Sequence, residues 1–216
     1  NASDRDFSVA EDSIRFGLAG VKNVGVGAIE AIITARREGK FDDFHNFCER
    51  VDLAKINKRV MESLIKCGAF DSMGYRRRQL IISHEGAMEA AQKRRKEKDS
   101  QQASLFDQLY SPEEQHAAVI KGNNSIVDVP EWDNKELLAY EKETLGFYIT
   151  GHPLFRFADS LSLVTNTDTE SISERKDKDS VVFGGIVSSI REVTTKKKDI
   201  MAYVTVEDLK GSVSVI

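Results

Sequence analysis

The stretch Gly25-Val26-Gly27-Ala28-Ile29-Glu30-Ala31 decides most of the fold prediction. Two glycines enclose one apolar residue, and the small residue Ala31 follows the second glycine by four positions. Glycines at the start of a helix let a partner approach the backbone closely, and the first amides of that helix attract anions. The stretch therefore predicts a tight turn followed by a helix whose start can bind a phosphate group.

This pattern resembles the helix-hairpin-helix motif, which binds the backbone of DNA. We expect Val26 to be buried between the two helices, and Lys22 and Asn23 to add contacts to phosphate oxygens. The alternative is a structurally neutral Gly-x-Gly helix start. A dinucleotide-binding turn is not favoured, because Glu30 stands where its third glycine would be.

A degenerate second copy follows further along the chain. Residues 57–66 have helical periodicity, Gly68 marks a turn, and a further helix opens with three consecutive arginines. Two such units packed together would each hold one strand of a duplex without reading its bases. The predicted duplex-DNA site comprises Lys22, Asn23, Val24, Gly25, Val26, Gly27, Gly68, Arg76, Arg77 and Arg78.

The remaining periodicity predicts a mixed fold of several domains. A short β-hairpin is expected over 7–16, helices from 20 to about 98, and further helices over 134–145 and 154–163. The first part is therefore mainly α-helical. From Val181 the apolar period changes to two, which predicts strands.

Three strands are expected in this last part. The first runs from Val181 to Ile190, with Gly184-Gly185 as a bulge or sharp coil, and the others cover 201–206 and 213–216. Three meandering strands are typical of the start of a five-stranded OB barrel, so a truncated OB fold is predicted. The basic turn and one aromatic residue are candidates for binding single strands: Lys196, Lys197, Lys198 and Tyr203.

Charge is distributed unevenly, although the net charge is only −4. Residues 72–98 hold eight basic and three acidic residues, whereas residues 99–145 hold ten acidic and three basic ones. The basic stretch is a candidate for phosphate contact, and DNA would repel the acidic one. Two solvated helix faces are the alternative interpretation.

A second short motif lies in a polar linker. The residues Gln102, Ala103, Ser104, Leu105 and Phe106 place an apolar pair where no local core can bury it. They resemble the pentapeptide by which many bacterial proteins dock on the sliding clamp. In that mode Leu105 and Phe106 fill a partner's pocket and Gln102 forms a hydrogen bond at its rim. A local apolar cluster is the alternative.

No arrangement of side chains predicts catalysis or metal binding. The two cysteines and four histidines lack zinc-ligand spacing, and no Ser/His/Asp or Cys/His set has a credible context. Asp4 and Asp6 lie near the N-terminus, and Asp177 and Asp179 lie in a solvated charged loop, so neither pair is favoured as a metal site. We therefore predict no catalytic residue, metal or cofactor in this chain. No stretch of about 18 apolar residues predicts a membrane span.

The order of these parts is specific enough to suggest a family. Four stretches precede the predicted strands: residues 14–25, residues 64–71, the pentapeptide at 102–106, and Gly-Phe-Tyr-Ile-Thr-Gly-His-Pro-Leu at 146–154. This order resembles the C-terminal half of the bacterial DNA polymerase III alpha subunit, the C family of replicative polymerases. The chain starts without Met, which we interpret as a segment of a longer protein.

The resemblance implies a domain order and a set of partners. The implied parts are a hairpin remnant of an upstream fingers domain (1–18), a tandem helix-hairpin-helix domain (19–98), a clamp-binding linker (99–130), a helical connector (131–172) and the start of an OB domain (173–216). Implied partners are duplex DNA, single-stranded template, the sliding clamp and other replisome subunits, in the cytoplasm. The polymerase's catalytic aspartates and Mg²⁺ would lie upstream.

Two other function classes stay open at this point. A helix-hairpin-helix repair enzyme such as a glycosylase would need a catalytic Asp or Lys in a base-sized pocket, and would give product on damaged duplex. A protein-interaction scaffold tethered to the clamp would show no salt-dependent DNA binding.

Overall fold

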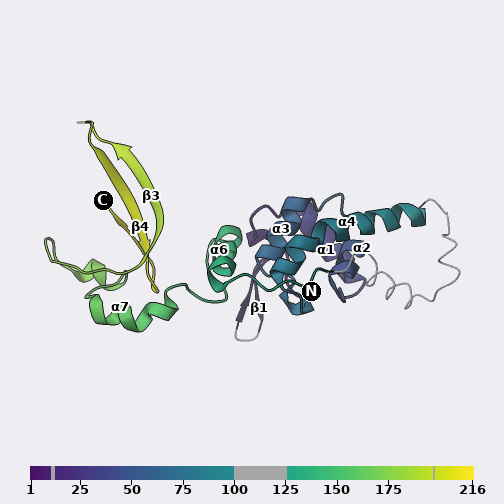
Figure 1. The fold of residues 1–216 in the computed structure, drawn as a ribbon, viewed down its shortest axis with the longest axis horizontal. Coiled ribbons are helices and arrows are strands. Elements are labelled where there is room, and N and C mark those ends of the chain that lie inside the picture. The colour runs from purple at the N-terminus through teal and green to yellow at the C-terminus, as the bar shows by residue number, and fades with distance from the viewer. Residues whose placement is uncertain (11–12, 100–125, 197) are drawn as a thin grey trace. The chain divides into compact units, whose positions relative to one another are not determined.

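The computed structural model describes residues 1–10, 13–99, 126–196 and 198–216, and the chain divides into two units (Figure 1). Helices make up most of the first unit, Asn1–Tyr148. The unit opens with an antiparallel pair of strands, as expected from the sequence. Its elements are β1 (Ser8–Ala10), β2 (Ser13–Arg15), η1 (Leu18–Gly20), α1 (Val26–Arg37), α2 (Phe44–Arg50), α3 (Lys58–Lys66), η2 (Asp71–Met73), α4 (Arg77–Asp99) and α6 (Asn134–Leu145).

Short polar side chains begin several of these helices. Asp43, Asn57 and Asp133 each accept a hydrogen bond from the backbone amide three residues later, at 2.7–3.0 Å. Such caps satisfy amides that the first helical turn leaves without a partner. Helix α6 ends at Gly146, whose φ of 89° is a left-handed conformation that glycine adopts without strain. The predicted helix over 134–145 is thereby confirmed.

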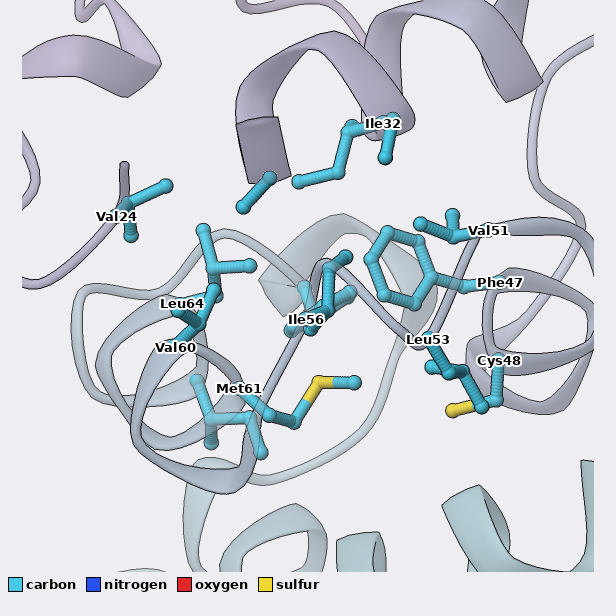
Figure 2. Packing of buried hydrophobic residues seen from close by; sticks show 14 of the residues in the cluster. Val24, Ile32, Phe47, Cys48, Val51, Leu53, Ile56, Val60, Met61 and Leu64 are labelled. Atoms are coloured by element: carbon cyan, nitrogen blue, oxygen red, sulfur yellow. The ribbon is translucent and has the colours of Figure 1, made fainter. Parts of the chain in front are cut away.

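The core of this unit lies between α1, α2, α3 and α4. Phe47, Val51 and Ile56 face the side chains of α3 across it (Figure 2). The ring of Phe70 meets those of Phe44 and Phe47 edge-on, with centroids 5.1 and 4.9 Å apart. Apolar residues at helical spacing thus close one core that fixes the two turns following η1 and α3.

Both cysteines of the chain are affected by this packing. Cys48 is fully buried, and burial raises the pKa of its thiol to about 12. Burial also raises the pKa of the Cys67 thiol, to about 11. Since the thiolate is the reactive form, we expect neither thiol to react appreciably with iodoacetamide at pH 8. Mass spectrometry should show two modifications only after denaturant is added, and rapid labelling of the folded chain would contradict this packing.

The second unit, Ile149–Ile216, ends in a three-stranded antiparallel sheet of order β3-β4-β5. Its elements are η3 (Phe155–Phe157), α7 (Ala158–Val164), η4 (Ser171–Glu174), β3 (Ile186–Thr194), β4 (Ile200–Glu207) and β5 (Ser212–Val215). The helix expected over 154–163 is a 3-10 turn followed by α7. A helical part followed by a small sheet is the predicted fold class, whereas the domain boundaries stay predictions.

Strand β3 begins later in the chain than the sequence predicts. Residues 181–185 precede β3, and the irregularity in pairing lies between Val187 and Ser189 instead of at the two glycines. Packing requires glycine at position 185, because an added Cβ would lie 2.6 Å from the carbonyl oxygen of Glu207. The backbone of this segment passes too close to β4 for a side chain to fit.

The turn between β4 and β5 is held by one buried carboxylate. Asp208 accepts hydrogen bonds from the amides of Thr169, Lys210 and Gly211 at 2.7–2.8 Å, and from the Thr169 hydroxyl at 2.6 Å. Burial by itself raises the pKa of Asp208, but these donors outweigh it and lower the pKa. Asp208 therefore fixes the sheet to the segment around Thr169.

Candidate nucleic-acid interface

The first hairpin presents an open helix start. Helix α1 begins after Gly25, whose backbone is extended, and no side chain caps it. The amides of Ala28 and Ile29 donate to the Gly25 carbonyl. The amides of Val26 and Gly27 come earlier in the first turn, where a helix offers no carbonyl to accept them. The twelve residues of α1 place the positive end of a helix dipole behind these amides.

Neither glycine of this turn is required by internal packing. A Cβ added at Gly25 or at Gly27 would meet no atom within 4 Å, and both residues are exposed. Gly25 has a φ of −80°, which any residue adopts. The surface above the two glycines is therefore free for a close approach by another molecule.

The apolar anchor of the hairpin is a different residue from the one predicted. Val26 is 50 % exposed, whereas Val24 is buried. The prediction for Val26 was wrong, because the chain enters α1 at this position and turns its side chain outward. Lys22 is exposed, and its amide donates to the carbonyl of Thr144. Asn23 adopts a left-handed φ of 68°, and its side chain donates to the Ser63 hydroxyl at 3.1 Å.

The second hairpin is closed by internal contacts. Gly68 has a φ of 79°, and an added Cβ would lie 2.6 Å from Oδ2 of Asp71. Glycine is thus required here by conformation and by packing, in contrast to Gly25 and Gly27. The turn leads through η2 to Arg76 and then to α4, which begins at Arg77.

Arg77 is a buried structural residue instead of a phosphate ligand. Its guanidinium donates to Asp71 at 2.6 Å and to Glu141 at 3.1 Å, and Glu141 is 1 % exposed. It also donates to the carbonyl of Lys66. Burial by itself lowers the pKa of Arg77, but the hydrogen bonds and charges of the two carboxylates outweigh it and raise the pKa. The predicted role of Arg77 in binding DNA is corrected accordingly.

The neighbouring residues Arg76 and Arg78 lie nearer the surface, and they also form hydrogen bonds within the chain. Nη1 of Arg76 donates to Asp128 at 2.9 Å and to the carbonyl of Val129 at 3.0 Å. The backbone amide of Arg78 donates to Glu131 at 3.0 Å, and its side chain is partly exposed. Acidic residues at positions 128 and 131 therefore lie against Arg76 and the start of α4.

The remaining predicted residues belong to the second unit or lie outside the described residues. Lys196 and Lys198 are exposed in the turn between β3 and β4, and Tyr203 on β4 is 40 % exposed, all in the second unit. Lys197 and the pentapeptide 102–106 lie outside the described residues. Among the described residues there is no group of three or more His, Cys, Asp or Glu side chains that would suit a metal ion.

Comparison with known proteins gives the family. A model described as a helix-hairpin-helix motif matches residues 1–80. The chain is 35 % identical to the DNA polymerase III subunit alpha of Borreliella burgdorferi over all of its length, and 36 % identical to that of Haemophilus influenzae over 98 %. The Vibrio cholerae protein of the same name is 35 % identical over 94 % of the chain.

The chain belongs to the DNA polymerase III alpha subunit family. It spans 17–19 % of the length of these three relatives. The family expected from the order of motifs is confirmed, and it favours a polymerase subunit over a repair enzyme. In the part of the chain that the structure describes, no helix is long and apolar enough to cross a membrane.

Three acidic residues that contact the second hairpin were not predicted from the sequence. The three arginines are contacted by Asp128, Glu131 and Glu141. Each of these contacts joins residues that are 52 to 64 positions apart in the sequence. The uneven charge distribution was the available signal, since it places an acidic stretch after a basic one. It was interpreted as repulsion from DNA, and the attraction between the two stretches was overlooked.

Proposed function

We propose that this segment holds duplex DNA by its phosphate backbone, in support of processive template-directed DNA synthesis by a longer polymerase subunit. The observation that carries the proposal is the first hairpin, where two exposed glycines leave open space beside the first amides of α1. Backbone amides at a helix start bind phosphate oxygens and carry no sequence information. Exposed Lys22 adds a positive charge beside them.

The proposal assigns no chemical step to this segment. Nucleotidyl transfer, its catalytic aspartates and its Mg²⁺ are proposed to belong to other parts of the parent subunit. The segment contributes by holding the primer–template duplex, in the cytoplasm and beside other replisome subunits. Support comes from the helix-hairpin-helix match and from the named polymerase relatives.

Two further contacts are proposed from the sequence pattern. Residues 102–106 would dock on the sliding clamp, which raises the local concentration of polymerase at the primer end without new catalytic groups. The second unit would approach single-stranded template with Lys196, Lys197, Lys198 and Tyr203, as the start of an OB domain. Exposed Tyr203 offers a ring on which a base can stack.

Substitution of the two open glycines tests the first hairpin. We expect Gly25→Val or Gly27→Val to weaken duplex binding about tenfold or more for every sequence, because the added side chain occupies the space for phosphate. The binding constant of the parent chain should fall steeply with salt, since bound phosphates release counterions. Fluorescence anisotropy with two unrelated duplexes at several salt concentrations measures both effects.

Gly86→Val is the matched control. Gly86 lies in α4, is exposed, and also leaves nothing within 4 Å of an added Cβ. This variant should bind duplex as the parent does, and all three variants should melt within a few degrees of it. Parental affinity of the Gly25 and Gly27 variants at low salt would overturn the proposed interface.

A further inference from the structure

The start of α4 is a built anion site that the chain itself occupies. One carboxylate oxygen of Glu131 accepts the amide of Arg77 at 2.7 Å, and the other accepts the amide of Arg78 at 3.0 Å. These are the amides that a helix start offers to a phosphate group. Helix α4 continues for 23 residues, so the dipole behind them is that of a long helix.

A second carboxylate lies beside the first. Asp128 accepts hydrogen bonds from Nη1 of Arg76 and Nε2 of Gln79, both at 2.9 Å. The amide of Val127 donates to the hydroxyl of Ser83, one turn further along α4. We call residues 127–131 the acidic strap. It contacts the two basic elements of the second hairpin that face the surface, the helix start and Arg76.

The two hairpins therefore differ in a way that local sequence does not show. The first has uncapped amides and open space, and the corresponding amides of the second are capped by Glu131. We propose that the acidic strap is a built-in phosphate mimic, which duplex DNA must displace before the second hairpin can bind it. This inference rests on the proposed binding of duplex DNA.

The ion pair that displacement would break is exposed, unlike the buried pair at this hairpin. The side chains of Arg76 and Asp128 are 50 % and 87 % exposed, and exposed ion pairs contribute little to stability. The pair Arg77–Glu141 is buried and holds α4 to α6 without the strap. The hairpin keeps its shape while the strap exchanges. Duplex affinity is then reduced by the fraction of molecules whose strap is closed.

The experiment compares Glu131→Gln with Glu136→Gln in the full 216-residue chain. Both substitutions remove one negative charge, and the side chain of Glu136 is exposed on α6 and is not among the strap contacts described above. We expect Glu131→Gln to tighten duplex binding about fivefold or more. Glu136→Gln should change it less than about twofold. Equal effects of the two variants would mean that only overall charge matters, and would overturn the inference.

Failure of the proposed strap and failure of DNA binding give different results. If the parent binds duplex and Glu131→Gln binds no better than Glu136→Gln, the strap is a fixed structural link and this inference is wrong. If none of the three binds at low salt, the proposed function has failed and the inference with it. Tight binding by Glu131→Gln alone would support both.

A measurement on the unmodified chain covers the case in which Glu131→Gln fails to fold. Saturating duplex DNA should accelerate hydrogen exchange at the amide of Val127, because its bond to Ser83 breaks when the strap leaves. Exchange at the core amide of Met61 serves as the reference for global opening. Unchanged or slower exchange at Val127 in the presence of bound duplex would contradict displacement.

Discussion

Arg77→Met is expected to lower the free energy of unfolding by about 3–5 kcal/mol, because the buried carboxylate of Glu141 loses its ion pair with Arg77. Glu141 is 1 % exposed and Arg77 is 7 % exposed, so water cannot replace the lost hydrogen bonds. The loss also frees Asp71 and the Lys66 carbonyl, which the same guanidinium contacts. Urea denaturation followed by circular dichroism measures the change.

The double variant Arg77→Met with Glu141→Leu separates burial of a charge from loss of packing. Removing both charges should recover most of the stability, since buried ion pairs are often replaceable by apolar side chains. Arg76→Met is the surface control and should cost less than about 1 kcal/mol. A loss for Arg77→Met no larger than that for Arg76→Met would show that the buried network is not the link between the second hairpin and α6.

The combined substitution Leu105→Ala and Phe106→Ala is expected to abolish binding to the sliding clamp. Each side chain gains roughly 1.5–3 kcal/mol when an apolar pocket of a partner buries it. Gln102→Ala should weaken binding by about 1 kcal/mol, the contribution of one hydrogen bond. Surface plasmon resonance with immobilised bacterial clamp measures the affinities.

Thermal melting and duplex binding are the controls for this variant. Both should stay unchanged, because the pentapeptide is predicted to face a partner and not the core. A local apolar cluster predicts the reverse outcome, a lower melting temperature with no effect on the clamp. If the parent chain shows no affinity for the clamp, the interpretation of residues 102–106 is wrong.

Local patterns in the sequence determined most of the elements. The apolar spacing of 29, 32 and 33 and of 60, 64 and 65 indicated helices whose inner faces are buried in the structure. Alternation from Val181 onward indicated strands, and the order of motifs indicated the polymerase III alpha family. Helical and strand periodicity depends on side chains within one helical turn or one pleat, so the nearby sequence is enough to predict it. The start of β3 was misplaced because Gly185 passes close to β4, a contact made across the sheet.

The roles within the candidate site were decided by tertiary structure alone. Arg76, Arg77 and Arg78 are equivalent in the sequence, yet Arg77 is buried against Glu141, Arg76 pairs with Asp128 at the surface, and the side chain of Arg78 is partly exposed. Val24 and Val26 both flank Gly25, and only the first lies in the core. The acidic residues that contact the arginines lie more than fifty positions further along the chain. Burial and the pairing of charges depend on which distant segments pack together, so a local pattern cannot assign them.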